Sequence, residues 1–178
     1  MTDLSAAEQA RQARGAAIRS RLTAGGVTIA ASLPDSWLTP TIDAVSADPG
    51  IVHTRVTRED DAAAIAAGAA LMGARSAVLC QNAGVLLATN MLAALAHHHQ
   101  LPFVILAADR GGPEDGFYYQ SYKGAVTSDV TAALRLPTHR VSGPQDDWLI
   151  ERSCEQAMMH RRPVVLLCSK AALTGAAA

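Results

Sequence analysis

The sequence predicts an α/β fold: a three-layer sandwich in which a mostly parallel sheet of about six strands has helices on both faces. Short runs of branched apolar residues alternate along the chain with longer stretches of helical composition, and this alternation is typical of parallel sheets. Several runs, such as V-V-L-L-C at 164–168, are apolar throughout, which indicates strands that are buried on both faces.

The first half of the chain is expected to form three helices and two strands. The first helix is rich in Ala, Arg and Gln and ends at two glycines, which stop helices. Asp35 or Ser36 is suited to cap the second helix, and a D-P-G turn precedes the second strand. In order, these elements are helix 4–24, strand 27–31, a helix to about residue 47, strand 51–56 and helix 61–72.

The second half repeats the pattern. Its elements are strand 76–80, helix 85–98, strand 103–107, a long polar loop at 111–126, helix 128–135, strand 138–141, helix 145–160 and strand 164–168. We expect residues 1–178 to be a single domain with an N-terminal helix at 1–24, and the tail at 170–178 to be frayed.

Composition argues against several classes of function. The net charge is -1, from 15 basic and 16 acidic residues, so the basic surface of a nucleic-acid-binding protein is missing. Residues 1–21 are polar and lack the apolar stretch of a signal peptide. The longest apolar run, 83–96, is too short to span a bilayer. We therefore expect no nucleic-acid partner and no membrane association.

The cysteines and histidines do not form a recognisable metal site. Cys80, Cys154 and Cys168 are far apart, odd in number and outside any C-x-x-C pattern. Cys80 and Cys168 end apolar runs and are expected to be small core residues. Successive residues on a helix are turned by about 100°, so the histidines at 97–99 cannot all face one ion. We expect no metal ligand in this chain, and a reducing, cytoplasmic location.

An acidic cluster directly precedes one of the most apolar helices. Acidic side chains in a first helical turn complement the helix dipole, and this is our interpretation of Asp60 and Asp61. Ligands of parallel sheets, however, bind beyond the carboxyl ends of the strands, and the cluster lies at such an end. The four stretches at these ends are 32–36, 57–61, 81–84 and 108–123. The sequence contains no G-x-G-x-x-G, P-loop or G-x-S-x-G motif, which argues against a nucleotide enzyme or serine hydrolase.

The stretch V-T-R-E-D-D-A-A-A-I-A-A-G-A-A-L-M-G-A-R-S-A-V-L-C-Q-N-A-G at 56–84 resembles the pyrimidine-binding (PYR) domain of thiamine-diphosphate enzymes. Within that superfamily the chain looks most like the α subunit of sulfopyruvate decarboxylase and the N-terminal half of phosphonopyruvate decarboxylase. The family's glutamate before a helix, with a glycine nine positions later, matches Glu59 and Gly68. Further family segments match Q-N-A-G at 81–84, L-P-F-V-I-L-A-A-D-R-G at 101–111, and Gln120, Gly124 and Thr127. The resemblance extends from about residue 27 to 141.

The resemblance implies a catalytic role for Glu59. In these enzymes the glutamate hydrogen-bonds N1′ of the aminopyrimidine ring, and so activates thiamine diphosphate to attack a 2-oxo acid, which then loses CO₂. The resemblance also implies that Gln81, Asn82 and Gly84 bind the cofactor. Gly68 would let its helix pack close to a neighbour.

Thiamine enzymes also need a domain that binds Mg²⁺ and the diphosphate, with G-D-G as its signature. This chain has no G-D-G; the nearest sequence is E-D-G at 114–116. The resemblance therefore implies a hetero-oligomer in which a separate diphosphate-binding (PP) β subunit binds most of the Mg²⁺ and diphosphate. The cofactor site would lie at the interface of the two subunits.

The implied substrate is a 2-oxo acid with an anionic tail, such as a sulfonate or phosphonate. Arg58, Arg110 and Lys123 are expected on ligand-facing loops as substrate-binding cations, and Gln120 as a further substrate-binding residue. For each cation a surface or packing role stays open. Three tyrosines between 118 and 122 are expected to line or close the pocket.

Two alternatives stay open. One is a PYR subunit of another thiamine-dependent decarboxylase or of a carboligase, which a substrate panel and the partner's identity would distinguish. The other is a non-catalytic α/β regulatory subunit. The presence of Glu59 argues against the second, because a scaffold does not need a carboxyl group there.

Overall fold

The computed structural model describes residues 5–175, and its six strands form one parallel sheet. The strand order is β2-β1-β3-β4-β6-β5, and every neighbouring pair is parallel. In chain order the strands are β1 (Val27–Ser32), β2 (Val52–Arg55), β3 (Arg75–Gln81), β4 (Val104–Ala108), β5 (Thr138–Val141) and β6 (Val164–Cys168). The predicted fold class is confirmed.

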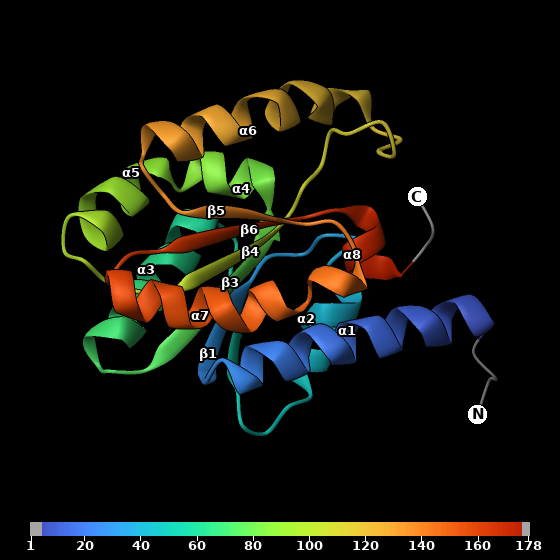
Figure 1. Ribbon diagram of the computed structural model, residues 1–178, viewed down its shortest axis with the longest axis horizontal. Helices are drawn as coiled ribbons and strands as arrows, with labels where there is room; N and C mark the ends of the chain where they lie inside the picture. The colour runs from blue at the N-terminus through green and yellow to red at the C-terminus, as the bar shows by residue number, and fades with distance from the viewer. Residues whose placement is uncertain (1–4, 176–178) are drawn as a thin grey trace.

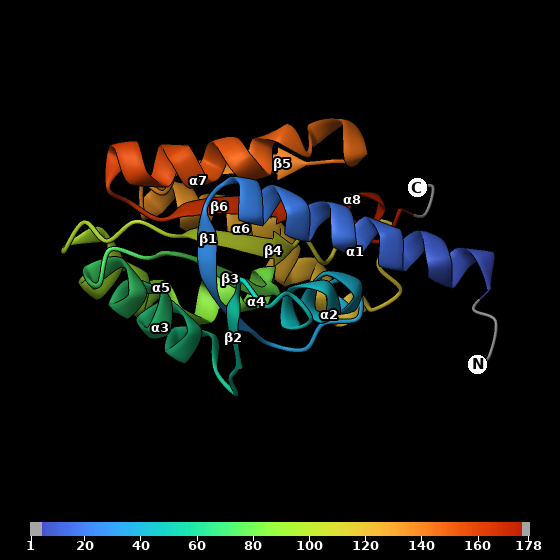
Figure 2. The ribbon, with the colours of Figure 1, turned by 90° about the horizontal axis from the view of Figure 1, so that it is seen from below.

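Helices cover both faces of the sheet (Figures 1 and 2). The helices on one face are α1 (Ala6–Ala24), α2 (Thr39–Ser46), α7 (Trp148–His160) and the short α8 (Lys170–Thr174). The helices on the other face are α3 (Glu59–Leu71), α4 (Asn82–Leu87), α5 (Thr89–Met91), the π-helical turn η1 (Leu92–His97) and α6 (Ser121–Ala133). Two 3₁₀ turns, η2 (Tyr118–Gln120) and η3 (Pro144–Asp146), precede α6 and α7. Within residues 5–175 no helix is both long and apolar enough to cross a membrane.

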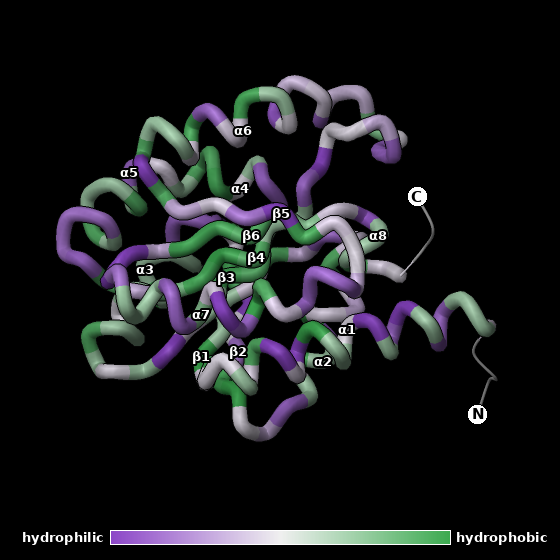
Figure 3. Tube along the Cα trace, in the orientation of Figure 1, coloured by the Kyte–Doolittle hydropathy of each residue, from purple (hydrophilic) through white to green (hydrophobic). Residues whose placement is uncertain are grey.

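The apolar strands in the middle of the sheet separate two hydrophobic clusters, one beneath each layer of helices. Figure 3 shows these strands as the most hydrophobic part of the trace. Cys80 and Cys168 lie in them and are buried, as expected, and Cys154 of α7 is buried as well. Burial raises the pKa of all three thiols, that of Cys154 to about 12.

Helix α1 is fixed to the body by a close backbone contact and by a buried arginine. A Cβ atom added to Gly15 would lie 2.2 Å from the carbonyl oxygen of Pro40, so α1 and α2 approach as closely as a glycine allows. The guanidinium of Arg14 pairs with Asp147 and donates to the carbonyl of Ala172. These contacts bind the first helix to α7 and α8.

Several predicted boundaries were wrong. The polar loop expected at 111–126 ends early, because α6 starts at Ser121, seven residues before the expected helix start at 128. Only Thr127 and Thr131 of α6 are buried and its other residues are half-buried or exposed, so its sequence lacks the apolar periodicity that predicts a helix. The helix expected from 61 begins at Glu59, and the one expected from 85 begins at Asn82.

The expectation of a frayed tail was also wrong for part of that segment. Lys170–Thr174 forms α8, which Ser169 caps by accepting a hydrogen bond from the N–H of Ala172. Ala172, Leu173 and Thr174 are buried. The ends of the two predicted terminal segments, 1–4 and 176–178, lie outside the described residues.

Candidate active site

The expected site residues gather at the carboxyl edge of the sheet, where parallel strands end together. Glu59 begins α3 shortly after β2, and Gln81 ends β3 directly before Asn82 begins α4. Arg110 follows β4, and Gln120 lies in the 3₁₀ turn before α6. Residues far apart in the sequence therefore share one edge.

The Glu59 side chain lies directly against Gly84. A Cβ atom added to Gly84 would be 2.3 Å from Cγ of Glu59 and 2.8 Å from its Cδ and Oε1. Only a glycine leaves this space for the carboxylate. Glu59 is half-buried, and within residues 5–175 its carboxyl group has no hydrogen bond and no ion pair.

The other residues of the acidic cluster match the interpretation as a helix start. Asp60 and Asp61 lie in the first turn of α3. Arg58 binds Asp60 through two hydrogen bonds of 2.9 and 3.0 Å, and the bond to Arg58 lowers the pKa of Asp60. The charge of Arg58 is thus matched by its neighbour, in a position open to solvent.

Gly68 was expected to permit close helix packing, and this was wrong. In the described part of the chain no neighbouring atom lies within 4 Å of a Cβ added to Gly68, and the residue is exposed. The close approach occurs at Gly84 instead.

The side chain of Asn82 forms hydrogen bonds to other residues of this chain. Its Nδ2 donates to the carbonyl of Arg110 at 2.9 Å, and its Oδ1 accepts from the N–H of Ala83 at 3.0 Å. The side chain is buried. It therefore joins the start of α4 to the end of β4.

Gln81 and Gln120 form a pair beside this link. Nε2 of Gln120 donates to Oε1 of Gln81 at 3.1 Å. Gln120 is buried, yet its Oε1 has no hydrogen-bond partner among residues 5–175. Since a buried acceptor without a partner costs about 1–3 kcal/mol, this atom is a place where a ligand donor would stabilise the site.

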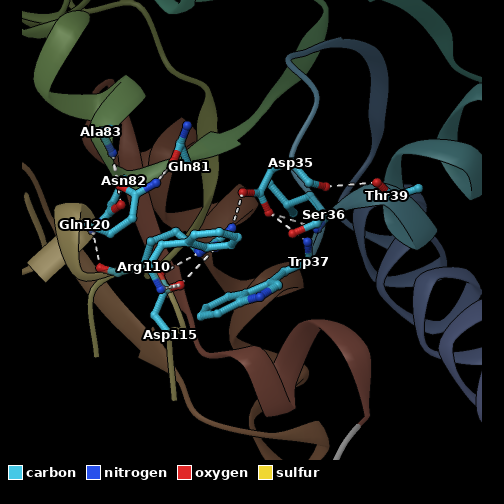
Figure 4. A network of polar contacts seen from close by, with 12 residues as sticks. Asp35, Ser36, Trp37, Thr39, Gln81, Asn82, Ala83, Arg110, Asp115 and Gln120 are labelled. Atoms are coloured by element: carbon cyan, nitrogen blue, oxygen red, sulfur yellow. Dashed lines mark hydrogen bonds and ion pairs between the residues drawn. The ribbon is translucent and has the colours of Figure 1, made fainter. Parts of the chain in front are cut away.

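Arg110 is enclosed by two carboxylates and a tryptophan (Figure 4). It binds Asp115 through Nε at 2.8 Å and Nη2 at 3.0 Å, and Asp35 through Nη1 at 2.8 Å. Its Cζ lies 4.2 Å from the ring centre of Trp37. The exposed fractions of the Arg110, Asp35 and Asp115 side chains are 5%, 4% and 1%. The hydrogen bonds and charges raise the pKa of Arg110 and lower that of Asp115.

Two glycines bring the start of α6 against this cluster. A Cβ on Gly111, whose φ is +94°, would lie 2.3 Å from the carbonyl oxygen of Gln120. A Cβ on Gly124 would lie 2.6 Å from the carbonyl oxygen of Arg110. The R-G and Q-x-x-x-G segments found in the sequence are therefore one contact in space.

The segment between these glycines exposes aromatic side chains. Tyr118 is 88% exposed, and Phe117, Tyr119 and Tyr122 are exposed as well. Nζ of Lys123 lies 5.5 Å from the ring centre of Tyr119. Within residues 5–175 no carboxylate pairs with Lys123.

Sequence reasoning missed the roles of Asp35 and Asp115. Asp35 was interpreted as a helix cap, and its Oδ1 does accept the N–H groups of Trp37 and Leu38. Its second oxygen binds Arg110, 75 residues away, and no local pattern predicts such a partner. Asp115, from the E-D-G sequence, is a partner of Arg110 as well. Residues 5–175 contain no group of three or more His, Cys, Asp or Glu side chains that could bind a metal.

The parallel sheet has at its carboxyl edge a carboxylate that lies against a glycine and has no partner in residues 5–175, and it defines an α/β domain of the class whose ligands bind at that edge. The chain belongs to the thiamine pyrophosphate (thiamine diphosphate) enzymes: residues 14–132 match their N-terminal TPP binding domain.

Named relatives agree with this family. The chain is 31% identical over 130 residues to the sulfopyruvate decarboxylase subunit alpha of Methanothermobacter thermautotrophicus, covering 73% of this chain and 79% of the relative. It is 40% identical over 142 residues to the phosphonopyruvate decarboxylase of Streptomyces viridochromogenes, covering 79% of this chain but only 36% of that protein. The fold is similar to part of the 2-oxoglutarate:ferredoxin oxidoreductase of Magnetococcus marinus, with a TM-score of 0.70 over 90% of this chain and 29% of the other, at 19% identity.

Proposed function

We propose that this chain is the α subunit of a thiamine-diphosphate-dependent 2-oxo acid decarboxylase of the sulfopyruvate or phosphonopyruvate type. The observation that supports this most is the Glu59 carboxylate, which lies on Gly84 without a partner in residues 5–175. Relatives named sulfopyruvate decarboxylase subunit alpha and phosphonopyruvate decarboxylase support the reaction class.

The residues at this edge fit an aminopyrimidine ring. Thiamine diphosphate, when bound, supplies the electron sink that decarboxylation of a 2-oxo acid requires. Glu59 can share a proton with a ring nitrogen, because a carboxyl group both donates and accepts. Gly84 leaves the space in which that carboxyl group lies. Gln81 contributes to the cofactor site as the partner of Gln120, and Asn82 by holding the start of α4 in place.

The diphosphate and Mg²⁺ are assigned to a separate PP β subunit, which makes the active enzyme a hetero-oligomer. This assignment rests on relatives that are named as alpha subunits, and residues 1–178 contain no G-D-G sequence. A diphosphate needs a cation and several N–H donors. The one comparable acidic sequence, E-D-G at 114–116, has its aspartate bound to Arg110.

The substrate is assigned to the same edge. Gln120 has a free buried acceptor, and Lys123 has no carboxylate partner within residues 5–175. These two residues are the strongest candidates in this chain to contact a 2-oxo acid. Arg58 stays a candidate that would have to leave Asp60. We further propose that residues 1–178 form one PYR domain and that the enzyme is cytoplasmic.

The test compares Glu59→Gln with Asp60→Asn, which changes the adjacent carboxylate of the same helix turn. Each chain is mixed with its candidate β subunit and assayed for CO₂ release from sulfopyruvate and phosphonopyruvate. Glu59→Gln should lower kcat by at least about 100-fold while assembly persists, as expected for a proton-transfer residue. Asp60→Asn should stay close to the parent. Full activity of Glu59→Gln would refute the proposal.

Titration calorimetry gives a second readout. Thiamine diphosphate with Mg²⁺ should bind the mixture of the two subunits and not this chain alone. Tight binding to the isolated chain would show that the division between subunits is wrong.

A further inference from the structure

Arg110 was expected to bind the anionic tail of the substrate, but its surroundings indicate another role. A cation that anchors a substrate anion needs open N–H groups and an unmatched charge. Three of the five N–H groups of Arg110 donate to two carboxylates that match its charge, and one of its faces is covered by Trp37. With two carboxylates and one guanidinium, the buried group has a net negative charge before any substrate approaches.

We propose that Arg110 is a positioning residue, which holds Gln120 and the aromatic segment 117–122 at the active-site edge through a clamp made of Asp35, Arg110 and Asp115. This inference rests on the proposed function. It concerns how Gln120 and segment 117–122 are held at the substrate-facing edge, and does not concern the proton transfer at Glu59.

The clamp connects segments that are distant in the sequence. Asp35 belongs to the loop between β1 and α2, and its Oδ1 is fixed by two backbone N–H groups of that loop. Asp115 belongs to the loop after β4 and accepts the N–H groups of Gly111 at 3.0 Å and Phe117 at 3.2 Å. Arg110 therefore links the loop after β4, which leads to the aromatic segment, to the loop between β1 and α2 (Figure 4).

The backbone at Arg110 contacts the residues that face the ligand. Its carbonyl oxygen accepts from Asn82 and lies against Gly124. The adjacent Gly111 lies against the carbonyl of Gln120. If the side chain of Arg110 loses its partners, both contacts lose their support, and the pairing of Gln120 with Gln81 shifts.

The clamp and the anchor interpretations predict different changes in KM and kcat/KM for substrates with and without a charged tail. An anchor recognises the charged tail, so its loss should raise KM for phosphonopyruvate or sulfopyruvate while pyruvate, which has no charged tail, is unaffected. A clamp positions Gln120 and segment 117–122 for every substrate. Its loss should therefore lower kcat/KM by the same factor for substrates with and without a charged tail.

The experiment uses Arg110→Lys, which keeps the charge but loses the planar fork, and Asp115→Asn, which removes the charge of a clamp partner while Arg110 itself is not replaced. Arg140→Gln is the matched control, because Arg140 pairs with Asp109 at the same edge of the sheet but is exposed and outside the clamp. Each variant is assayed with the β subunit on phosphonopyruvate, sulfopyruvate and pyruvate.

Amide hydrogen exchange of this chain alone gives a readout that does not need activity. In Asp115→Asn the amides of Gly111 and Phe117 should exchange faster, one of them by at least about 10-fold, because asparagine offers a single neutral acceptor oxygen where Asp115 has two charged ones. In Arg140→Gln these amides should exchange as in the parent. This measurement still tests the clamp if the chain is not a decarboxylase at all.

The clamp is supported if both clamp variants lower kcat/KM for all three substrates by a similar factor and exchange rises at Gly111 and Phe117. It is overturned if Arg110→Lys affects only the substrates with charged tails, because Arg110 is then their anchor. It is equally overturned if exchange at the two amides does not change in Asp115→Asn. Since the Asn variant keeps the shape of Asp115, it tests the clamp even if Arg110→Lys does not fold.

Discussion

Replacing Gly84 by alanine should disable the active site and leave the fold nearly as stable as before. The added Cβ would lie 2.3 Å from Cγ of Glu59, whereas carbon atoms in contact are separated by about 3.5–4.0 Å. Glu59 must therefore move by more than about 1 Å, and a misplacement of this size costs about 100-fold in rate when it affects a catalytic group.

The effect on stability should be small because two contributions oppose each other. Alanine is favoured over glycine within a helix by about 0.8–1.0 kcal/mol, and Gly84 has an ordinary helical φ in α4. A strained Glu59 rotamer costs about 0.5–1.5 kcal/mol. The free energy of unfolding of Gly84→Ala should thus stay within about 1 kcal/mol of the parent.

Urea denaturation of the isolated chain and decarboxylation by the assembled enzyme separate the two effects. Gly68→Ala is the matched control for helix propensity, because no atom lies within 4 Å of the added Cβ; it should raise the free energy of unfolding by up to about 1 kcal/mol. In a Glu59→Ala background, Gly84→Ala should stabilise as much as Gly68→Ala does. If Gly84→Ala had the same effect on stability with and without Glu59, or kept full activity, the reasoning would be refuted.

Three further predictions concern other parts of the molecule. Gly15→Ala should lower the free energy of unfolding by about 1–3 kcal/mol in urea denaturation, because its Cβ would meet the backbone of Pro40; an unchanged midpoint would show that α1 can shift freely. The thiol of Cys154, with its pKa raised to about 12 by burial, should stay protonated at pH 8 and react with a thiol reagent only on unfolding; rapid reaction of the native chain would contradict this. Arg110 lowers the pKa of Asp115 below its ordinary value of 3.8, so the pair stabilises the fold above that pH and loses this contribution as the pH falls through the lower folded value. Acid titration of unfolding should therefore be shallower below pH 3.8 in Asp115→Asn, and an identical acid limb would argue against the ion pair.

The sheet and the helix that follows the acidic cluster could be predicted because their signals are local, whereas Glu59 was singled out by the resemblance to the PYR domain. Apolar runs such as V-V-L-L-C indicate buried strands wherever they occur, and acidic residues before an apolar helix mark its start. Both signals lie within a few residues. The start of α6 had no such signal, since its exposed surface removes the apolar periodicity, and it was predicted too late.

The partners of Arg110 could not be predicted, because they are set by the packing of loops. The sequence indicates a helix cap at Asp35 and a polar loop at Asp115. Each interpretation accounts for its residue without a contact to Arg110. The expectation that Gly68 permits a close approach had the same limit, because that approach occurs at Gly84. Both precede apolar residues within helices, and only the three-dimensional arrangement shows which one has a side chain lying against it.

The strand order has a consequence for how the molecule is made. The residues of the candidate active site are complete by Gly124, yet β4, which leads to Arg110, has β6 as its neighbour. During synthesis, one edge of β4 stays without its strand until residues 164–168 emerge, and an open, apolar strand edge invites pairing with other chains. A nascent chain that already contains every candidate catalytic residue therefore still has an open apolar strand edge, and the last strand covers that edge by entering the interior of the sheet.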